Sequence, residues 1–331
     1  MKEKVLLIGG AGYLGRVISE EFINKNYFVR VLDNCIYQGI KNQFKIKSSN
    51  FEFMYGDKSD LVTLKKALNN IDIVVLLSGL VGDPVTKKYK KLSKKTNIYK
   101  TKKCIKFINK HKIKKLIFVS TCSNYGVTRK KIPVNEKSIL NPISAYSKAK
   151  VQIEKFLIAN KKKLNFSFTI LRFSTAFGYS NRMRYDLTVN QFVKDIYLGK
   201  RIELYDSDTW RPYCHVKDFA NAIHRVMQAN KKLTKNNIFN VGRNENNFSK
   251  LSLIKLIIKK MKKGNYKIVK NSNDRRDYIV DFSKIKKILK FTPQISVSYG
   301  IKEILEKLKK GNIKENKLNQ LGNYKVKRKF V

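Results

Sequence analysis

The chain has 331 residues, and its 42% hydrophobic and 11% aromatic content exclude a disordered protein and allow a large folded core. No apolar run reaches the roughly 18 residues of a membrane span, and the first apolar run ends in glycines without the cleavage pattern of a secretion signal. Four scattered cysteines, with no CxxC and no nearby histidine pair, indicate neither a disulfide framework nor a metal site, so we expect a cytoplasmic protein without metal.

The charge is strongly positive, with 72 Lys and Arg against 24 Asp and Glu and a net charge of +48. A nucleic-acid binder would have such a charge. The lysines, however, are spread over nearly every predicted helix, and asparagine and isoleucine are abundant too, which favours a lysine-biased solvated surface. We therefore expect no nucleic-acid and no membrane partner, although a diphosphate-bearing ligand should be attracted.

The first half of the chain alternates short β-branched runs with longer amphipathic segments. Helical patterns lie at about 13–25, 59–69, 88–110 and 144–162. Such alternation predicts an α/β fold of the Rossmann type, a doubly wound parallel sheet covered by helices on both faces, over residues 1–173. Ligands bind such sheets at the carboxyl ends of the strands. The six predicted strands are Val5–Ile8, Phe28–Leu32, Phe51–Tyr55, Ile73–Leu77, Lys115–Ser120 and Phe166–Phe173.

The pattern changes after about residue 174 to mixed short elements. Helical stretches are predicted near 186–198, 217–229, 249–262, 282–290 and 298–310, with short strands between them. We interpret residues 174–310 as mainly a smaller mixed α/β substrate-binding lobe. The polar and basic tail, 311–331, is predicted to be poorly ordered.

The motif GGAGYLG carries Gly9, Gly12 and Gly15 directly after the first strand and at the start of a helix. Glycines there allow a tight turn and a close approach of the backbone to a pyrophosphate. Asp33 ends the second strand about 20 residues later, where a carboxylate meets an adenosine ribose and repels a 2′-phosphate. The pattern predicts NAD rather than NADP, with a loop for another nucleotide's phosphate as the alternative.

The next two strands also end in polar or small residues, Gly56-Asp57 and LLSGLVGDP. Both ends should line the same cofactor groove. For Asp57 a turn or helix-capping role is the alternative.

Tyr146 and Lys150 lie four residues apart in a predicted helix, so they share a face, whereas Lys148 points to solvent. A tyrosine ionises near pH 10 and is a poor base at neutral pH. A cation about 4 Å away at an effective dielectric of 20 contributes about 4 kcal/mol, which could lower the phenol pKa by as much as about 3 units. The pair therefore predicts a tyrosine base tuned by Lys150.

STCSNYG follows the fifth strand and puts Thr121 at the same sheet edge. Together, the glycine motif, Asp33, Thr121 and the YxxxK pair resemble the extended short-chain dehydrogenase/reductases, in particular the nucleotide-sugar epimerase/dehydratase group. The resemblance runs from Met1 to about Leu308. It implies that Tyr146 transfers the proton, that Lys150 assists it and that Thr121 is the catalytic hydroxyl residue.

The resemblance also implies substrate contacts. Asn97 occupies the place of an asparagine near the cofactor, with Lys100 in place of the usual glycine of that motif. Thr175 replaces a substrate-facing asparagine. Arg211, in WRPYCHVKD, and Arg276, or alternatively Arg275, should bind the substrate diphosphate, because the planar fork of arginine matches phosphate oxygens. The residues expected to contact NAD are Gly9, Gly12, Tyr13, Leu14, Gly15, Asp33, Asn34, Asp57 and Lys150.

Relatives that dehydrate the sugar usually have Asp-Glu after the hydroxyl residue, and here Cys122 and Ser123 stand there. The resemblance therefore implies an NAD-dependent epimerase of a nucleotide-diphosphate sugar, as a homodimer. A nucleotide-sugar reductase or dehydrogenase on the same site is the alternative, and a non-catalytic cofactor-sensing or nucleic-acid-binding module is a further one. Cys122 could serve as an acid or base for epimerisation at an adjacent carbon, or simply pack in the core.

Overall fold

The computed structural model describes residues 3–37, 46–128, 132–269, 276–311, 318 and 321–327. Its main layer is a seven-stranded sheet of order β10-β6-β5-β4-β1-β2-β3, in which every neighbouring pair is parallel. The predicted fold class and the six predicted strands are confirmed. The strands are β1 (Lys4–Ile8), β2 (Phe28–Asp33), β3 (Phe51–Tyr55), β4 (Ile73–Leu76), β5 (Lys115–Thr121), β6 (Ser167–Phe173) and β10 (Asn237–Val241).

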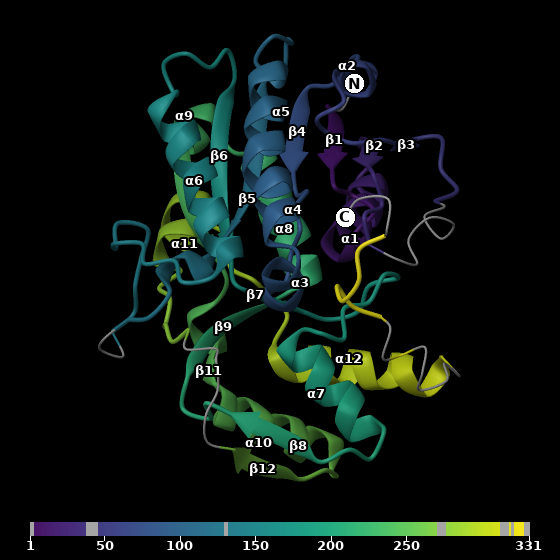
Figure 1. The fold of residues 1–331 in the computed structure, drawn as a ribbon, viewed down its shortest axis with the longest axis vertical. Coiled ribbons are helices and arrows are strands. Elements are labelled where there is room, and N and C mark those ends of the chain that lie inside the picture. Colours follow the sequence, from purple (N-terminus) through teal and green to yellow (C-terminus); the bar gives the residue numbers. More distant parts are fainter. Residues whose placement is uncertain are drawn as a thin grey trace.

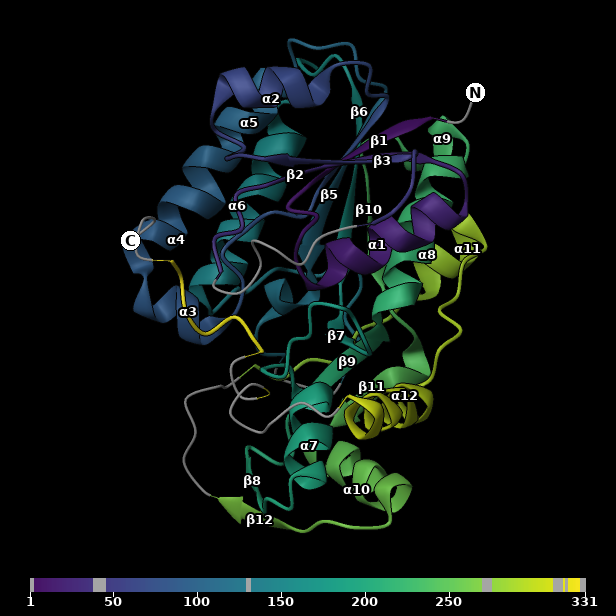
Figure 2. The ribbon, with the colours of Figure 1, turned by 90° about the vertical axis from the view of Figure 1, so that its right-hand side faces the viewer.

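Helices cover both faces of this sheet, as Figure 2 shows. One face carries α1 (Tyr13–Asn24), α8 (Val216–Gln228) and α11 (Ser283–Leu289), and the other carries α2 (Leu61–Leu68), α5 (Lys100–Ile108) and α6 (Ala145–Ala159). The strand order reverses between β1 and β4. In open sheets of this kind the crevice at such a reversal is the ligand site.

The second lobe lies below the sheet in Figure 1. It contains a three-stranded sheet of order β11-β9-β7 and a two-stranded sheet of β12 and β8. Its elements are β7 (Thr175–Phe177), α7 (Thr188–Tyr197), β8 (Ile202–Tyr205), β9 (Trp210–His215), η3 (Asn244–Asn246), β11 (Asn247–Ser249), α10 (Lys250–Met261), β12 (Tyr266–Val269) and α12 (Val297–Lys310).

Part of the second half returns to the main layer. β10 pairs in parallel with β6 at the edge of the large sheet, and α8 packs on α1. α9 (Lys231–Thr234) follows α8 and precedes β10 in the chain. The apolar run of β10 is too short to identify its sheet from the sequence. β10 and α8 are thus the part of residues 174–310, interpreted as mainly the second lobe, that belongs to the main layer.

The predicted helix at 88–110 is divided into three pieces. These are α4 (Lys90–Lys94), the π-helix η1 (Lys95–Tyr99) and α5, preceded by α3 (Asp83–Lys88). π-helical turns occur frequently at functional sites. The 3₁₀ turn η2 (Cys122–Tyr125) similarly ends β5 at the site edge.

The C-terminal tail differs from the prediction of poor order over residues 321–327, which we call the C-terminal strap. Leu318 and Val326 are buried, and Val326 forms an antiparallel bridge with Tyr37. The two views agree that the strap runs beside α3, where the sheet meets the second lobe (Figures 1 and 2). These two apolar residues, which the basic composition conceals, explain the packing.

Within the described ranges, no helix is long and apolar enough to cross a membrane. Nor do three His, Cys, Asp or Glu side chains of those ranges gather into a metal-binding group.

Candidate active site

The glycine loop between β1 and α1 has room for glycine only. Gly9 has φ of +89°, and a Cβ on it would lie 2.5 Å from Ser78 Cα. A Cβ on Gly15 would lie 2.4 Å from Gly10 Cα. The loop therefore brings the backbone close to β4 and directs the N-terminus of α1 at the crevice, where it can bind a phosphate.

Asp33 lies at the end of β2 and faces this loop. Its Oδ2 accepts a hydrogen bond from Ala11 N (3.0 Å) and its Oδ1 accepts one from Cys35 N (2.7 Å). Burial raises the pKa of its carboxyl group. Each oxygen has a second lone pair, so Asp33 can still accept from a ribose hydroxyl.

Asp57 makes the turn contact that was the alternative for it, and it also lines the site. Its Oδ1 accepts from Ser59 N (2.9 Å), which is a turn contact, while Oδ2 accepts from Asn34 Nδ2 and from Lys100 Nζ, both at 2.8 Å. Burial would raise the pKa of Asp57, but the hydrogen bonds from Lys100 and Ser59 outweigh it and lower the pKa to about 2. The lysine that replaces the motif glycine is thus the ion-pair partner of Asp57.

Lys58, which the sequence analysis missed, is a buried cation beside Asp57. Its Nζ donates to Ser78 Oγ (3.0 Å) and to Thr101 Oγ1 (2.8 Å). Burial lowers its pKa to about 8. Nothing in the sequence distinguished it from the other lysines of the chain.

A cavity of about 990 Å³ runs from the glycine loop to the second lobe, within the size range of ligand sites. It brings together residues that are far apart in the sequence, and among the predicted site residues only Lys150 and Asn97 are outside its lining. The predicted residues that line it are Gly9, Gly12, Tyr13, Leu14, Gly15, Asp33, Asn34, Asp57, Thr121, Tyr146, Thr175, Arg211 and Arg276. Arg275 lies outside the described residues.

Tyr146 and Lys150 share one face of α6, and Lys148 is exposed, as predicted. The Lys150 ammonium lies 5.7 Å from the centroid of the Tyr146 ring and donates to Val119 O at 2.6 Å. Burial, with a contribution from the charge of Lys58, lowers the pKa of Lys150 to about 7. The charged form of Lys150 is therefore less favoured than that of a lysine in water.

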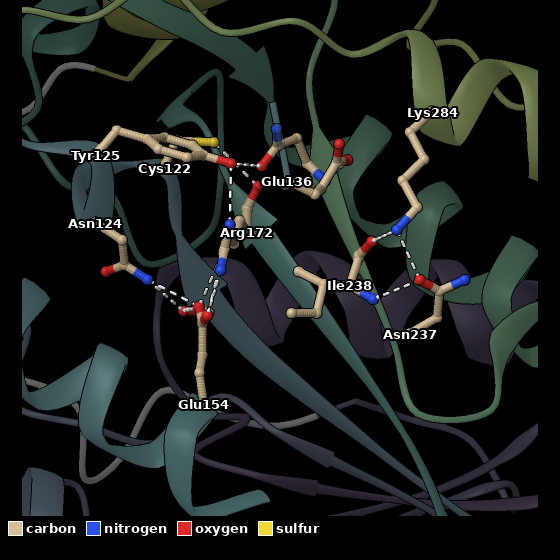
Figure 3. A network of polar contacts seen from close by, with 11 residues as sticks. Cys122, Asn124, Tyr125, Glu136, Glu154, Arg172, Asn237, Ile238 and Lys284 are labelled. Carbon is tan, nitrogen blue, oxygen red and sulfur yellow. Dashed lines mark hydrogen bonds and ion pairs between the residues drawn. The ribbon is translucent and has the colours of Figure 1, made fainter. Parts of the chain in front are cut away.

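The helix that carries this pair is held to the sheet by a buried network (Figure 3). Glu154, on α6, forms an ion pair of 2.7 Å with Arg172 on β6. Asn124 also donates to Glu154, at 2.8 Å, and Arg172 donates to the Tyr125 hydroxyl at 3.0 Å. Because both ions are buried and well bonded, the network fixes where α6 lies relative to β5 and β6.

Thr121 and the two residues after it face different surroundings. Thr121 lines the cavity, and its Oγ1 accepts from Ser123 N at 3.1 Å. Ser123 lines the cavity as well. Cys122 is fully buried, its Sγ donates to Arg172 O at 3.2 Å, and burial raises the pKa of its thiol well above the usual range (Figure 3). The structure therefore favours the packing role for Cys122.

At the far end of the cavity two arginines meet a tyrosine that the sequence analysis missed. Arg211, on β9, lies with its guanidinium carbon 5.3 Å from the centroid of the Tyr278 ring. The Tyr278 hydroxyl lies 3.2 Å from Ser123 Oγ. Arg276 also lines this end. Tyr278 thus connects the arginine end of the cavity to the segment that carries Thr121.

Asn97 is not part of the cavity lining and instead hydrogen-bonds to the loop after β4. Its Oδ1 accepts from Leu80 N (2.7 Å) and its Nδ2 donates to Leu80 O (3.0 Å). Both amide atoms are thereby committed to the backbone after β4. The structure does not support the direct substrate contact expected of Asn97.

These features define a dinucleotide-dependent enzyme of the extended short-chain dehydrogenase/reductase type. Residues 5–242 match the model of the NAD dependent epimerase/dehydratase family, and the chain belongs to this family. The predicted family, enzyme class and NAD cofactor are thereby confirmed.

Named relatives and a solved structure agree with this assignment. The UDP-glucose 4-epimerase of Lactobacillus helveticus is 28% identical over 72% of this chain and 76% of its own length. The UDP-glucuronate 4-epimerase of Thermodesulfobacterium geofontis is 26% identical over 90% of this chain and 93% of its own. The structure of the UDP-glucose 4-epimerase of Thermotoga maritima with UDP-glucose is 26% identical, has a TM-score of 0.82, and the match covers 93% of this chain and 99% of that one.

Proposed function

We propose that the protein is an NAD-dependent epimerase that oxidises a nucleotide-diphosphate sugar to a keto-sugar and reduces it again on the other face. The observation that carries the proposal is the single cavity, which has the glycine loop and Asp33 at one end, Arg211 and Arg276 at the other, and Thr121 and Tyr146 along its lining. In a nucleotide-diphosphate sugar the diphosphate joins the sugar to the nucleoside, so the sugar would lie near Tyr146 and the diphosphate near the arginines.

Tyr146 is the proposed base, because it lines the cavity and its ring lies 5.7 Å from the Lys150 ammonium. As a phenolate it takes the proton of a sugar hydroxyl, and the Thr121 hydroxyl hydrogen-bonds the same oxygen. The glycine loop and Asp33 would hold NAD, which would supply the reversible hydride acceptor for that carbinol. Arg211 and Arg276 hold the diphosphate while the keto-sugar turns.

Dehydration of the sugar is not supported by the residues after Thr121. Cys122 donates its thiol to Arg172 O inside the core, and Ser123 has only a hydroxyl. The carboxylates that line the cavity within the described residues are Asp33, Asp57 and Asp186, none of which comes from this segment. An acid and base pair next to Thr121 is therefore lacking in the described part of the chain.

The test is a panel of nucleotide sugars incubated with the purified holoenzyme and followed by product analysis and NADH absorbance. We expect interconversion of one sugar pair without net NADH formation or consumption. Stoichiometric consumption or formation of NADH would favour the reductase or dehydrogenase. Absence of turnover on the whole panel, together with tight and salt-sensitive DNA or RNA binding, would favour the non-catalytic module.

The finer expectations remain proposals. A homodimer is consistent with α5 and α6 lying side by side on one face of the sheet (Figure 1). Tyr99, just before α5, and Ile158, in the last turn of α6, are exposed apolar or aromatic side chains. A cytoplasmic enzyme of carbohydrate biosynthesis is consistent with a nucleotide-sugar substrate. Light scattering of the purified protein would test the dimer.

A further inference from the structure

The C-terminal strap connects the two sides of the cavity near the glycine loop. At its start, Leu321 O accepts a hydrogen bond from Tyr185 N (2.8 Å), on the segment before α7. At its end, Lys327 N donates to Ile36 O (3.0 Å), just after β2. Between these points Asn323 lines the cavity. The strap is therefore in a position to contribute to whatever the glycine loop binds.

Arg182 lies between the strap and the glycine loop. Its backbone N–H donates to Ser180 Oγ (3.3 Å), and that hydroxyl donates to Tyr13 O (2.8 Å) in the first turn of α1. Its guanidinium carbon lies 5.4 Å from the centroid of the Tyr37 ring, and Nη2 donates to Gly322 O at 3.2 Å. The guanidinium is thus held on one side by an aromatic ring and on another by the strap.

Charges of both signs lie near Arg182, namely Arg184 on one side and the carboxylates of Asp186 and Asp33 on the other. Burial lowers its pKa to about 10, and the nearby charge of Arg184 adds to that effect. Asp186 is paired with Arg184, and no carboxylate of the described residues forms an ion pair with Arg182. Arg182 lines the cavity, so an anionic group of a ligand bound there would stabilise its buried charge.

Asn323 provides a second, independent observation. It is 5% exposed, and its Nδ2 donates to Val81 O at 2.9 Å. Its Oδ1 is buried and has no hydrogen-bond partner among the described residues. A buried acceptor without a partner is costly, so a ligand donor in the cavity would satisfy it.

We propose that the C-terminal strap is part of the NAD site, with Arg182 as the cation that binds the diphosphate of the dinucleotide and Asn323 as a hydrogen-bond acceptor for the same molecule. The ion pair is charge-assisted and shielded from water by the strap and Tyr37. The strap therefore slows release of the cofactor. This inference concerns the NAD site and does not depend on which sugar reaction follows.

The test compares affinities of the full chain for three probes, namely NAD, ADP-ribose and adenosine, by calorimetry at one salt concentration. Loss of a hydrogen-bonded charge should weaken the binding of NAD and ADP-ribose by about 10- to 100-fold in Arg182→Gln. Adenosine, which has no diphosphate, should bind as before. Asn323→Ala should weaken the binding of NAD by roughly tenfold. The matched control is Lys325→Gln, an exposed lysine of the same strap.

Truncation gives a second measurement. A chain that ends at Gln320 should lose its NAD during gel filtration much faster than one that ends at Lys327, which keeps the strap. If the shorter chain does not fold, the two point variants decide. Unchanged NAD affinity in Arg182→Gln, or an equal loss for adenosine, would overturn the proposal. A wild-type protein that binds NAD as predicted but turns over no sugar would overturn only the epimerase proposal.

Discussion

The cavity has two ends that are built from different parts of the polypeptide. At the cofactor end, a glycine loop, a helix N-terminus and the ends of parallel strands line the wall, and Asp33 is fixed by backbone N–H groups. At the substrate end, Arg211 comes from β9 and Arg276 from the segment before α11, and Tyr278 of that segment packs on Arg211. The backbone fixes the first end, whereas the second depends on how long side chains pack on one another.

This difference has a mechanistic consequence. A backbone wall cannot be altered without changing the fold, so the cofactor end is suited to a ligand that is the same in every reaction cycle. Side chains can be exchanged individually without changing the fold, so the substrate end can determine specificity. Helix α6, which carries the proposed base Tyr146, is held to the sheet by Glu154 and Arg172.

The largest expected effect comes from breaking the chemistry that lies between the two ends. Tyr146→Phe should lower kcat by about 10² to 10⁴-fold, because it removes the proton acceptor and leaves the ring. NAD affinity should change little, and the measurement is turnover combined with a titration of NAD. Lys148→Gln, an exposed change on the same helix, is the matched control. Turnover by Tyr146→Phe at a normal rate would remove the catalytic assignment.

The cofactor end was largely predictable from the sequence, because the spacing of Gly9, Gly12, Gly15 and Asp33 reflects local backbone geometry. The YxxxK pair was predictable for the same reason, since two residues that are four apart in a helix lie on the same face. Tyr278 and Asn323 could not be found in this way, because their partners depend on how remote segments pack. The pKa of Lys150 was not predictable either, since burial and the charge of Lys58 both follow from the tertiary structure.

A change at the substrate end should instead affect binding. Arg211→Gln should raise KM by about 10- to 100-fold with a smaller change in kcat, because it removes a charge-assisted contact to the diphosphate. Arg211→Lys should recover only part of the loss, since the planar fork is missing. Arg201→Gln, an exposed arginine just before β8, is the control. The assignment would be wrong if steady-state kinetics gave Arg211→Gln an unchanged KM.

The smallest expected effect on activity concerns Lys58 at the cofactor end, and its effect on stability is measured as a pH dependence. Burial lowers the pKa of Lys58 to about 8 from its ordinary value of 10.5, so between these values the unfolded chain binds a proton that the folded chain does not. The free energy of unfolding should therefore rise with pH across this window. The stability gained from deprotonation of Lys58 is lost again as the pH falls through about 8.

Lys58→Met removes that ionisable group and its repulsion of Lys150. At neutral pH the free energy of unfolding of the variant should exceed that of the wild type by on the order of a few kcal/mol, reduced by the loss of the two hydrogen bonds of Lys58. This difference should shrink as the pH rises towards 10.5. The pKa of Lys150 should rise, so the alkaline limb of kcat/KM should move to higher pH. Thermal unfolding at several pH values, with exposed Lys65→Met as the control, checks the first effect. Parallel pH curves for Lys58→Met and the wild type would show that Lys58 is not a strained cation, and that the low pKa of Lys150 arises from its own burial.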